Sequence, residues 1–313
     1  MSPRAALRTS APAKIILGGE HAVVYGVPAL VLPLSGLRTE VSLRESNVPS
    51  MRVLLADLAE PSEAQMAFVS GACRTIVEGL GQSLPDATLE VRSTVPLASG
   101  LGSSASLCVA LARAFSRLHG ASLEPVDIQR LANAAEQAAH GRASGVDTAA
   151  IAWGRPLRFV TGQPPGFLTL PEPLTLVIAH SGECGSTQAV VLDVAMRREV
   201  EPERFAGIFA DVGDAVARMT AALALGDRMA LGKAMTDNQQ ALQAMGVSTP
   251  MLDGLVTAAI GAGAFGAKLT GAGWGGCAMA LVSAETADAV GQAMVDAGAH
   301  WARFTTVGAS PSK

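Results

Sequence analysis

The sequence predicts an α+β protein of two domains, on three observations. The chain has 313 residues, a length that suits about two domains of ordinary size. Short apolar stretches of strand length alternate with longer stretches of helical spacing in both halves, as in folds that layer helices on sheets. A glycine-serine loop, residues 96–105, leads directly into a helical pattern. We expect an N-terminal domain at residues 1–165 and a C-terminal domain at 166–313, divided near the proline-glycine stretch 161–166.

Composition argues against several classes of function. The formal net charge is −4 and only 16% of residues are charged, whereas a nucleic-acid-binding protein usually presents a basic face, so we expect no nucleic-acid partner. No apolar run is long enough for a membrane span, and the N-terminus lacks a signal-peptide core. We therefore expect a cytoplasmic protein with no membrane partner. The four cysteines show no CxxC spacing and are expected to be reduced core residues: Cys73, Cys108, Cys184 and Cys277.

Periodicity predicts the elements of each half. Helices are expected where apolar residues recur at three- and four-residue intervals, and strands at short apolar or alternating stretches. In the first half these are strands at 14–17, 29–34, 39–43, 88–93 and 157–160, and helices at 62–80, 107–118 and 126–139. In the second half they are strands at 174–179, 267–270, 277–282 and 302–307, and helices at 201–225, 227–245, 250–261 and 285–297. A methionine stripe is expected to lie in the core: Met219, Met229, Met235 and Met245.

The loop 96–105 is the strongest candidate for a ligand site. Gly100 and Gly102 allow backbone amides to approach a ligand closely, and the helix behind them directs its unpaired N–H groups to the same place. Such a place binds phosphate. Ser103 and Ser104 are expected to cap the helix, and a serine hydroxyl beside a phosphate is a ligand for Mg²⁺. The alternative is an ordinary strand-to-helix turn.

Other polar residues complete a set suited to phosphoryl transfer. Lys14 ends an apolar strand, Glu136 lies on a predicted helix, Asp147 ends the tight turn 144–147, and a second glycine-rich loop spans 271–276. Phosphoryl transfer depends mainly on positioning and charge neutralisation, which these residue types supply. The chain has no GxxxxGK[ST] motif, so it is not a P-loop NTPase, and the motifs of protein kinases are absent from its sequence.

Three separated segments resemble the motifs of the GHMP kinases: residues 11–26, 96–105 and 268–277. The resemblance implies a ribosomal protein S5 domain 2-like N-terminal domain, a ferredoxin-like C-terminal domain, and ATP- and Mg²⁺-dependent phosphorylation of a small-molecule hydroxyl. Within the family, Glu20-His21 and the stretch 136–147 most resemble the members that phosphorylate mevalonate on its primary hydroxyl. Mevalonate and ATP are thus the expected small-molecule partners.

The resemblance also assigns roles to residues. It implies Asp147 as the catalytic base and Lys14 as the cation beside it, both also touching substrate, with Mg²⁺ held by Ser104 and Glu136. It further implies phosphate-loop contacts to ATP from Pro96, Gly100, Leu101, Gly102, Ser103, Ser104 and Ala105, and a substrate side shaped by Glu20, His21, Gly271, Ala272 and Gly273. These roles require Asp147 and Lys14 to lie near the bend 100–104.

Alternatives remain for each level of this interpretation. Lys14 could instead be a solvated residue at a strand end, and Asp147 could only form an Asx-turn. Glu136 could be an exposed helix residue that pairs locally, and His21 could be a hydrogen-bonded structural histidine. Phosphomevalonate and a sugar such as galactose are alternative substrates within the family. A non-catalytic sensor of a nucleotide or metabolite is the alternative outside enzymes, and a homodimer is left open.

The chain departs from the family pattern at Ala13, Arg142-Ala143, Thr148 and Trp274, and two of these departures bear on the substrate. Trp274 stands where the third motif usually continues with glycine, and it places a large ring beside the second glycine-rich loop. Arg142-Ala143 stands where Asn-Pro or Thr-Pro is frequent. Neither change removes a proposed catalytic group, but both bear on the range of substrates.

Overall fold

The computed structural model describes residues 6–46, 50–58, 60–141, 144–183 and 185–308. The chain forms two compact units. The first unit comprises residues 1–13, 37–96 and 102–154, and the second comprises 14–36, 97–101 and 155–313. Two long strands, β1 (Leu7–Gly18) and β2 (Ala29–Glu45), pair with each other and contribute residues to both units. The units are sets of residues in contact, and the domain boundary after residue 165 stays a prediction.

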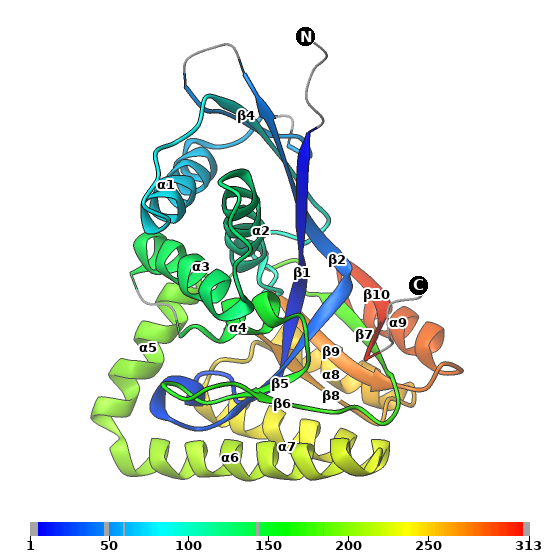
Figure 1. Ribbon diagram of the computed structural model, residues 1–313. Helices are drawn as coiled ribbons and strands as arrows, with labels where there is room; N and C mark the ends of the chain where they lie inside the picture. The colour runs from blue at the N-terminus through cyan, green and yellow to red at the C-terminus, as the bar shows by residue number, and fades with distance from the viewer. Residues whose placement is uncertain (1–5, 47–49, 59, 142–143, 184, 309–313) are drawn as a thin grey trace. The chain divides into compact units, whose positions relative to one another are not determined.

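The first unit is a sheet packed against helices (Figure 1). Strand β4 (Ala87–Ser93) lies between β3 (Arg52–Leu55), which is parallel to it, and residues 39–45 of β2, which are antiparallel to it. The helices contact one another across several pairs. They are α1 (Glu63–Gly79), α2 (Ser103–Leu118), α3 (Pro125–His140) and α4 (Val146–Trp153).

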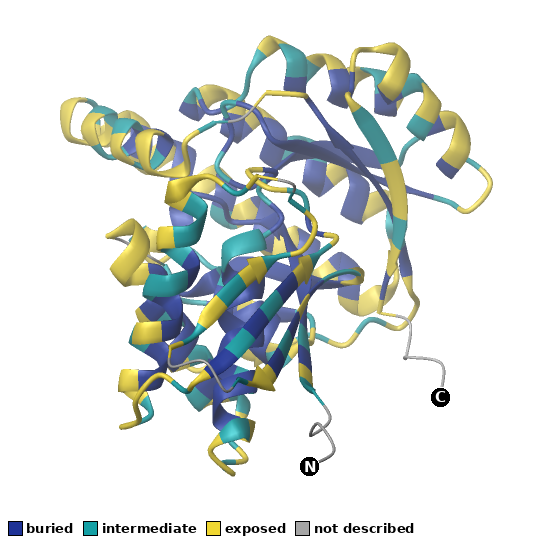
Figure 2. Ribbon diagram, turned by 90° about the horizontal axis from the view of Figure 1, so that it is seen from above, coloured by how far each residue is buried: buried dark blue, intermediate teal, exposed yellow. Residues whose placement is uncertain are grey.

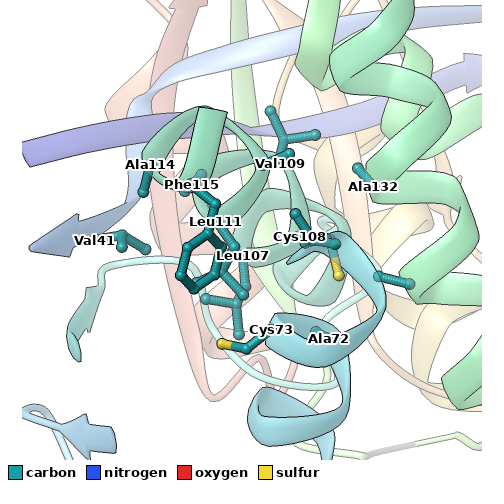
Figure 3. Packing of buried hydrophobic residues seen from close by; sticks show 14 of the residues in the cluster. Val41, Ala72, Cys73, Leu107, Cys108, Val109, Leu111, Ala114, Phe115 and Ala132 are labelled. Carbon is teal, nitrogen blue, oxygen red and sulfur yellow. The ribbon is translucent and has the colours of Figure 1, made fainter. Parts of the chain in front are cut away.

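The core of the first unit follows the alternation of its strands. Val41 and Leu89 are buried, and the residues that alternate with them along β2 and β4 turn the other way. On the helix side, Phe115 of α2 and Cys73 of α1 lie fully buried in the same cluster (Figure 3). Burying a side chain such as Phe115 contributes about 2–3 kcal/mol to stability. This packing fixes α2, whose first turn carries Ser104.

The second unit contains an antiparallel sheet in the order β10-β7-β9-β8. Every residue of β8 and β9 is buried, as expected for strands covered on both faces. The strands are β7 (Leu174–His180), β8 (Gly266–Thr270), β9 (Cys277–Val282) and β10 (Trp301–Val307). Two smaller strands pair with each other, β5 (Leu157–Phe159) and β6 (Gly166–Phe167), and residues 29–31 of β2 pair with β5.

Helices of the second unit pack on this sheet and on each other. Helices α8 (Pro250–Gly261) and α9 (Ala287–Asp296) contact the sheet, α7 (Arg228–Met245) contacts β8, and α6 (Pro202–Leu225) contacts α7. Helix α5 (Thr187–Val200) contacts α6, and a short 3₁₀ helix covers Ala22–Tyr25. Figure 2 shows helices with one buried and one exposed face. Within the described parts of the chain, no helix has the length and apolar character to cross a membrane.

Several element predictions need correction. The predicted break at Ser35-Gly36 is wrong, because β2 continues through both residues and pairs with β5 before them and β4 after them. Helices α4 and α5 were not expected from the sequence. Helix α4 is short, and α5 buries only Val190 and Val194, so its apolar periodicity is weak.

Two predictions about the core have mixed outcomes. Met219, Met235 and Met245 are buried as expected, but Met229 is 67% exposed, so its place in the stripe is wrong. Cys73, Cys108 and Cys277 are free and buried, as predicted, and Cys184 lies outside the described residues.

Candidate active site

The start of α2 differs from the predicted serine cap. Its N-cap is Gly102, with φ of 76° and no side-chain hydrogen bond to the first turn. A positive φ is accessible to glycine at little cost. The cap prediction for Ser103 and Ser104 is therefore wrong, because the Ser104 hydroxyl is used elsewhere. The first-turn amides of α2 receive no side-chain cap, which is the arrangement that suits an anion.

Ser104 instead joins a buried polar group inside the first unit. Its hydroxyl donates a hydrogen bond to Glu136 Oε2 at 3.1 Å, and Cys108 Sγ lies 3.6 Å from the other oxygen. Glu136 is buried on α3, so it is not the exposed, locally paired residue of the alternative reading. Burial raises the pKa of the Glu136 carboxyl, the Ser104 bond opposes this, and the charge of Asp147 raises it further.

These residues fit Mg²⁺. Among the described residues no cluster of three or more His, Cys, Asp or Glu side chains is placed to hold a metal. Mg²⁺ does not need such a cluster, because it keeps several waters and binds through one or two carboxylates plus substrate phosphates. Glu136 with its bonded Ser104 hydroxyl, near the charge of Asp147, supplies that kind of donor set.

Asp147 lies in the first turn of α4. The predicted tight turn 144–147 is right only in its first half, because Val146 and Asp147 already belong to the helix: Gly145 is the N-cap, with φ of 79°, and the Ser144 hydroxyl accepts from the Val146 N–H at 3.3 Å. Thr148 Oγ1 donates to the Gly145 carbonyl at 3.2 Å. The half-exposed Asp147 carboxylate thus sits at the positive end of the α4 dipole, a position that favours negative charge.

In the second unit, the strand before the first motif's glycines meets the phosphate loop. Lys14 is buried, and its Nζ donates to the Gly100 carbonyl at 3.1 Å while its backbone N–H donates to the Leu101 carbonyl at 2.9 Å. The solvated strand end considered for Lys14 is therefore wrong. The same strand binds the third motif, because Thr270 Oγ1 accepts from the Ile16 N–H and donates to the Ile16 carbonyl, both at 3.1 Å.

The two glycine-rich loops touch through their backbones in this unit. A Cβ placed on Gly100 would lie 3.0 Å from the Thr270 carbonyl oxygen, and one placed on Gly271 would lie 3.0 Å from Gly100 Cα. Their φ values are 76° and 90°, a region that favours glycine. Close approach and backbone conformation both require glycine at these two positions.

Glu20 and His21 are each tied to the third motif. Lys268 forms a fully buried ion pair with Glu20. Burial raises the pKa of Glu20, and the Lys268 charge opposes this rise. His21 Nε2 lies 2.8 Å from the Ala272 carbonyl oxygen, which only accepts, so Nε2 carries the proton and Nδ1 is an acceptor. Burial and the Lys268 charge lower the pKa of His21 to about 4, against the opposing Ala272 bond.

Lys268 is the residue that sequence reasoning missed. A lone charged residue inside the apolar strand 266–270 is the signal that could have found it, because a buried lysine needs a partner. The bond from His21 to Ala272 fits the structural alternative for this histidine, and its contact with substrate stays a prediction.

Trp274 is half-buried and is hydrogen-bonded to the turn between α7 and α8. Its Nε1 donates to the Gly246 carbonyl at 3.0 Å, and its N–H donates to the Val247 carbonyl at 2.8 Å. A Cβ on Gly273 would overlap that Val247 carbonyl, so this glycine is required for close packing. Arg142-Ala143 lies outside the described residues.

The predicted site residues therefore form two groups. The first unit brings together Ser104 at the start of α2, Asp147 at the start of α4 and Glu136 near the end of α3. The second unit brings together the segments of Lys14, Gly100 and Gly271. The closeness of Asp147 to Lys14, and the contacts of Pro96 to Ala105 with ATP, stay predictions.

A glycine-serine loop before a helix, a buried glutamate bonded to a serine and a helix-borne aspartate are groups that phosphoryl transfer to a small molecule uses. Two family models match the chain, the GHMP kinases N terminal domain at residues 67–155 and the GHMP kinases C terminal domain at residues 219–300. The chain belongs to the GHMP kinases, and the predicted two-domain GHMP kinase fold is confirmed.

Several similar proteins within that family are named mevalonate kinases. The mevalonate kinase of Thermococcus gammatolerans is 36% identical over 299 residues, which cover 87% of this chain and 88% of that protein. The crystal structure of L. major mevalonate kinase in complex with R-mevalonate matches with a TM-score of 0.88 and 28% identity, covering 99% of both chains. The Methanococcus jannaschii mevalonate kinase matches with a TM-score of 0.81 and 25% identity, covering 97% of this chain and 99% of that one.

Proposed function

We propose that this chain phosphorylates the primary hydroxyl of mevalonate, using ATP and Mg²⁺, and gives 5-phosphomevalonate. The observation that carries the proposal is the hydrogen bond from Ser104, at the start of α2, to the buried Glu136 near the charge of Asp147. The mevalonate kinases among the relatives of this chain support the substrate. We propose the cytoplasm as its compartment.

The residues of the first unit divide the chemistry among themselves. The α2 amides behind Gly102 bind phosphate oxygens, and Ser104 with Glu136 holds Mg²⁺, which offsets phosphate charge when bound. Asp147 takes the proton from the substrate hydroxyl. The hydroxyl oxygen then bonds to the γ-phosphorus of ATP, while the bond between that phosphorus and the oxygen bridging it to the β-phosphate breaks. ADP leaves with the electron pair of that bond.

The residues of the second unit supply charge and shape. Lys14, fixed by the Gly100 carbonyl, offers a cation to the substrate oxygen. The loop 271–273 is held close to Gly100 by glycine contacts, and Glu20 and His21 are held by Lys268 and Ala272. A neutral His21 with an acceptor at Nδ1 suits a substrate hydroxyl.

A panel of acceptors tests the proposal. ADP release is measured with ATP, Mg²⁺ and, in turn, mevalonate, phosphomevalonate, galactose and homoserine. We expect turnover with mevalonate far above the others. Turnover with another acceptor alone would replace the substrate, and nucleotide binding with no turnover on any acceptor would favour the sensor.

A further inference from the structure

A polar cavity of about 520 Å³ lies in the first unit, beside the sheet. Strands β1, β2 and β4 and helix α2 line it. Among its described lining residues, Val41 alone is apolar. The volume falls in the range of small-molecule sites, and the walls are mostly polar.

Four arginines gather at this cavity. They are Arg8 of β1, Arg38 of β2, and Arg113 and Arg117, which lie one turn apart on α2. None of the four has a carboxylate within salt-bridge distance among the described residues. Guanidinium groups without a carboxylate partner repel each other, so an anion bound among them would lower their electrostatic free energy.

Two of these guanidinium groups are held in place without being neutralised. Arg38 donates to the Ser10 hydroxyl through Nη2 at 2.7 Å, and Arg113 donates to the Ser10 carbonyl through Nη1 at 2.7 Å. Arg113 also donates to the Ala152 carbonyl at 2.9 Å. Burial, Arg38 and Arg117 lower the pKa of Arg113. Neutral oxygens thus fix the positions of the cations and leave their charge available.

Two acidic residues, Glu40 and Glu90, also line the cavity. Glu90 pairs with Arg92 at 2.6 Å, and Glu40 faces Arg92 across the β2–β4 ladder. Five arginines and two glutamates among the described lining residues give a local charge of +3, whereas the whole chain carries −4. The cavity therefore carries positive charge although the net charge of the protein is negative.

We propose that this cavity binds a small polyanion, a metabolite that carries two or more phosphate groups. Guanidinium forks match phosphate oxygens in pairs, and several of them together suit adjacent phosphates better than a single charge. The polar walls exclude a long apolar chain on the ligand. This site is separate from the phosphate loop at Gly100 to Ser104 and does not depend on the proposed function.

Inorganic pyrophosphate is the probe, measured by titration calorimetry at low salt, where ion pairing is least screened. The test variant is Arg8→Glu/Arg117→Glu, because both side chains are exposed and bond no described residue. The matched control is Arg74→Glu, an exposed arginine on α1 of the same unit. Arg8→Ala and far-UV circular dichroism check that folding is retained.

We expect the double variant to weaken pyrophosphate binding by about tenfold or more, as for loss of charged hydrogen bonds, and Arg74→Glu to match the wild type. Any pyrophosphate bound at the phosphate loop binds equally in all variants. The difference in affinity between the double variant and the wild type therefore reports binding in the cavity. Wild-type affinity in the double variant, or no binding to the wild type, would overturn the proposal. Equal affinity for citrate would overturn the assignment to phosphate groups.

Discussion

Burial sets the proton chemistry of His21. The ring donates to Ala272 and has a pKa of about 4, chiefly because burial disfavours the imidazolium. The unfolded chain, with a pKa near 6.5, binds more protons between pH 4 and pH 6.5. The free energy of unfolding therefore falls as pH drops through that window, and recovers above it.

The expected size of this loss is about 2 kcal/mol between pH 7 and pH 5. Urea unfolding at the two pH values measures it, with His21→Gln as the variant that cannot titrate and His119→Gln, at an exposed position after α2, as the control. We expect His21→Gln to lose about that much less stability on acidification than the wild type does. An equal pH dependence in all three proteins would show that His21 is not held neutral.

The sequence singled out polar residues that stand in motifs and missed one that matters through burial, while the catalytic roles stay predictions. Lys14, Ser104 and Glu136 were found from their motifs, and the structure gives each a fixed partner. Lys268 was missed, because its importance comes from an ion pair with Glu20, far away in the sequence. A salt bridge of this kind depends on tertiary contacts that no local pattern reports.

Glycines set how closely elements of the second unit pack. A Cβ on Gly266 of β8 would overlap the carbonyl of Gly232 on α7, and a Cβ on Gly232 would overlap the carbonyl of Phe265. Helix and strand therefore lie backbone to backbone at this point. Neither residue has the positive φ that would explain glycine by conformation alone.

Gly266→Ala is expected to lower the free energy of unfolding by about 2–3 kcal/mol, because α7 must move away from β8. Gly254→Ala is the control, since that exposed position within α8 has open space around it, and alanine there favours the helix by about 0.5–1 kcal/mol. Thermal unfolding of both variants measures the difference. Equal midpoints for the two would contradict close packing at Gly266.

Among the helices and strands, the point at which a strand ends was the hardest feature to predict from the sequence. Serine and glycine at residues 35 and 36 suggested a break, yet β2 runs on because it has partners before and after them. The long amphipathic helices α6 and α7 followed directly from periodicity. Pairing across a sheet can therefore override a local breaker.

At the scale of the molecule, the order of three motifs predicted the two-domain GHMP kinase fold, and family matches over both halves confirm it. The sequence did not predict that each compact unit is built from three separate segments of the chain. A glycine-rich loop does not indicate to which unit the residues before and after it belong. Residues 97–101 belong to the second unit and 102–154 to the first. The phosphate loop thus passes from one unit to the other just before α2.

The most direct measurement is the mevalonate-dependent rate of ADP formation by Asp147→Asn, beside Asp127→Asn as a control at the start of α3. Loss of a general base lowers kcat by about 10²–10⁴-fold, while ADP affinity is expected to stay close to wild type. Asp127→Asn is expected to keep the wild-type rate. An unchanged kcat in Asp147→Asn would contradict the proposed phosphoryl transfer through this aspartate.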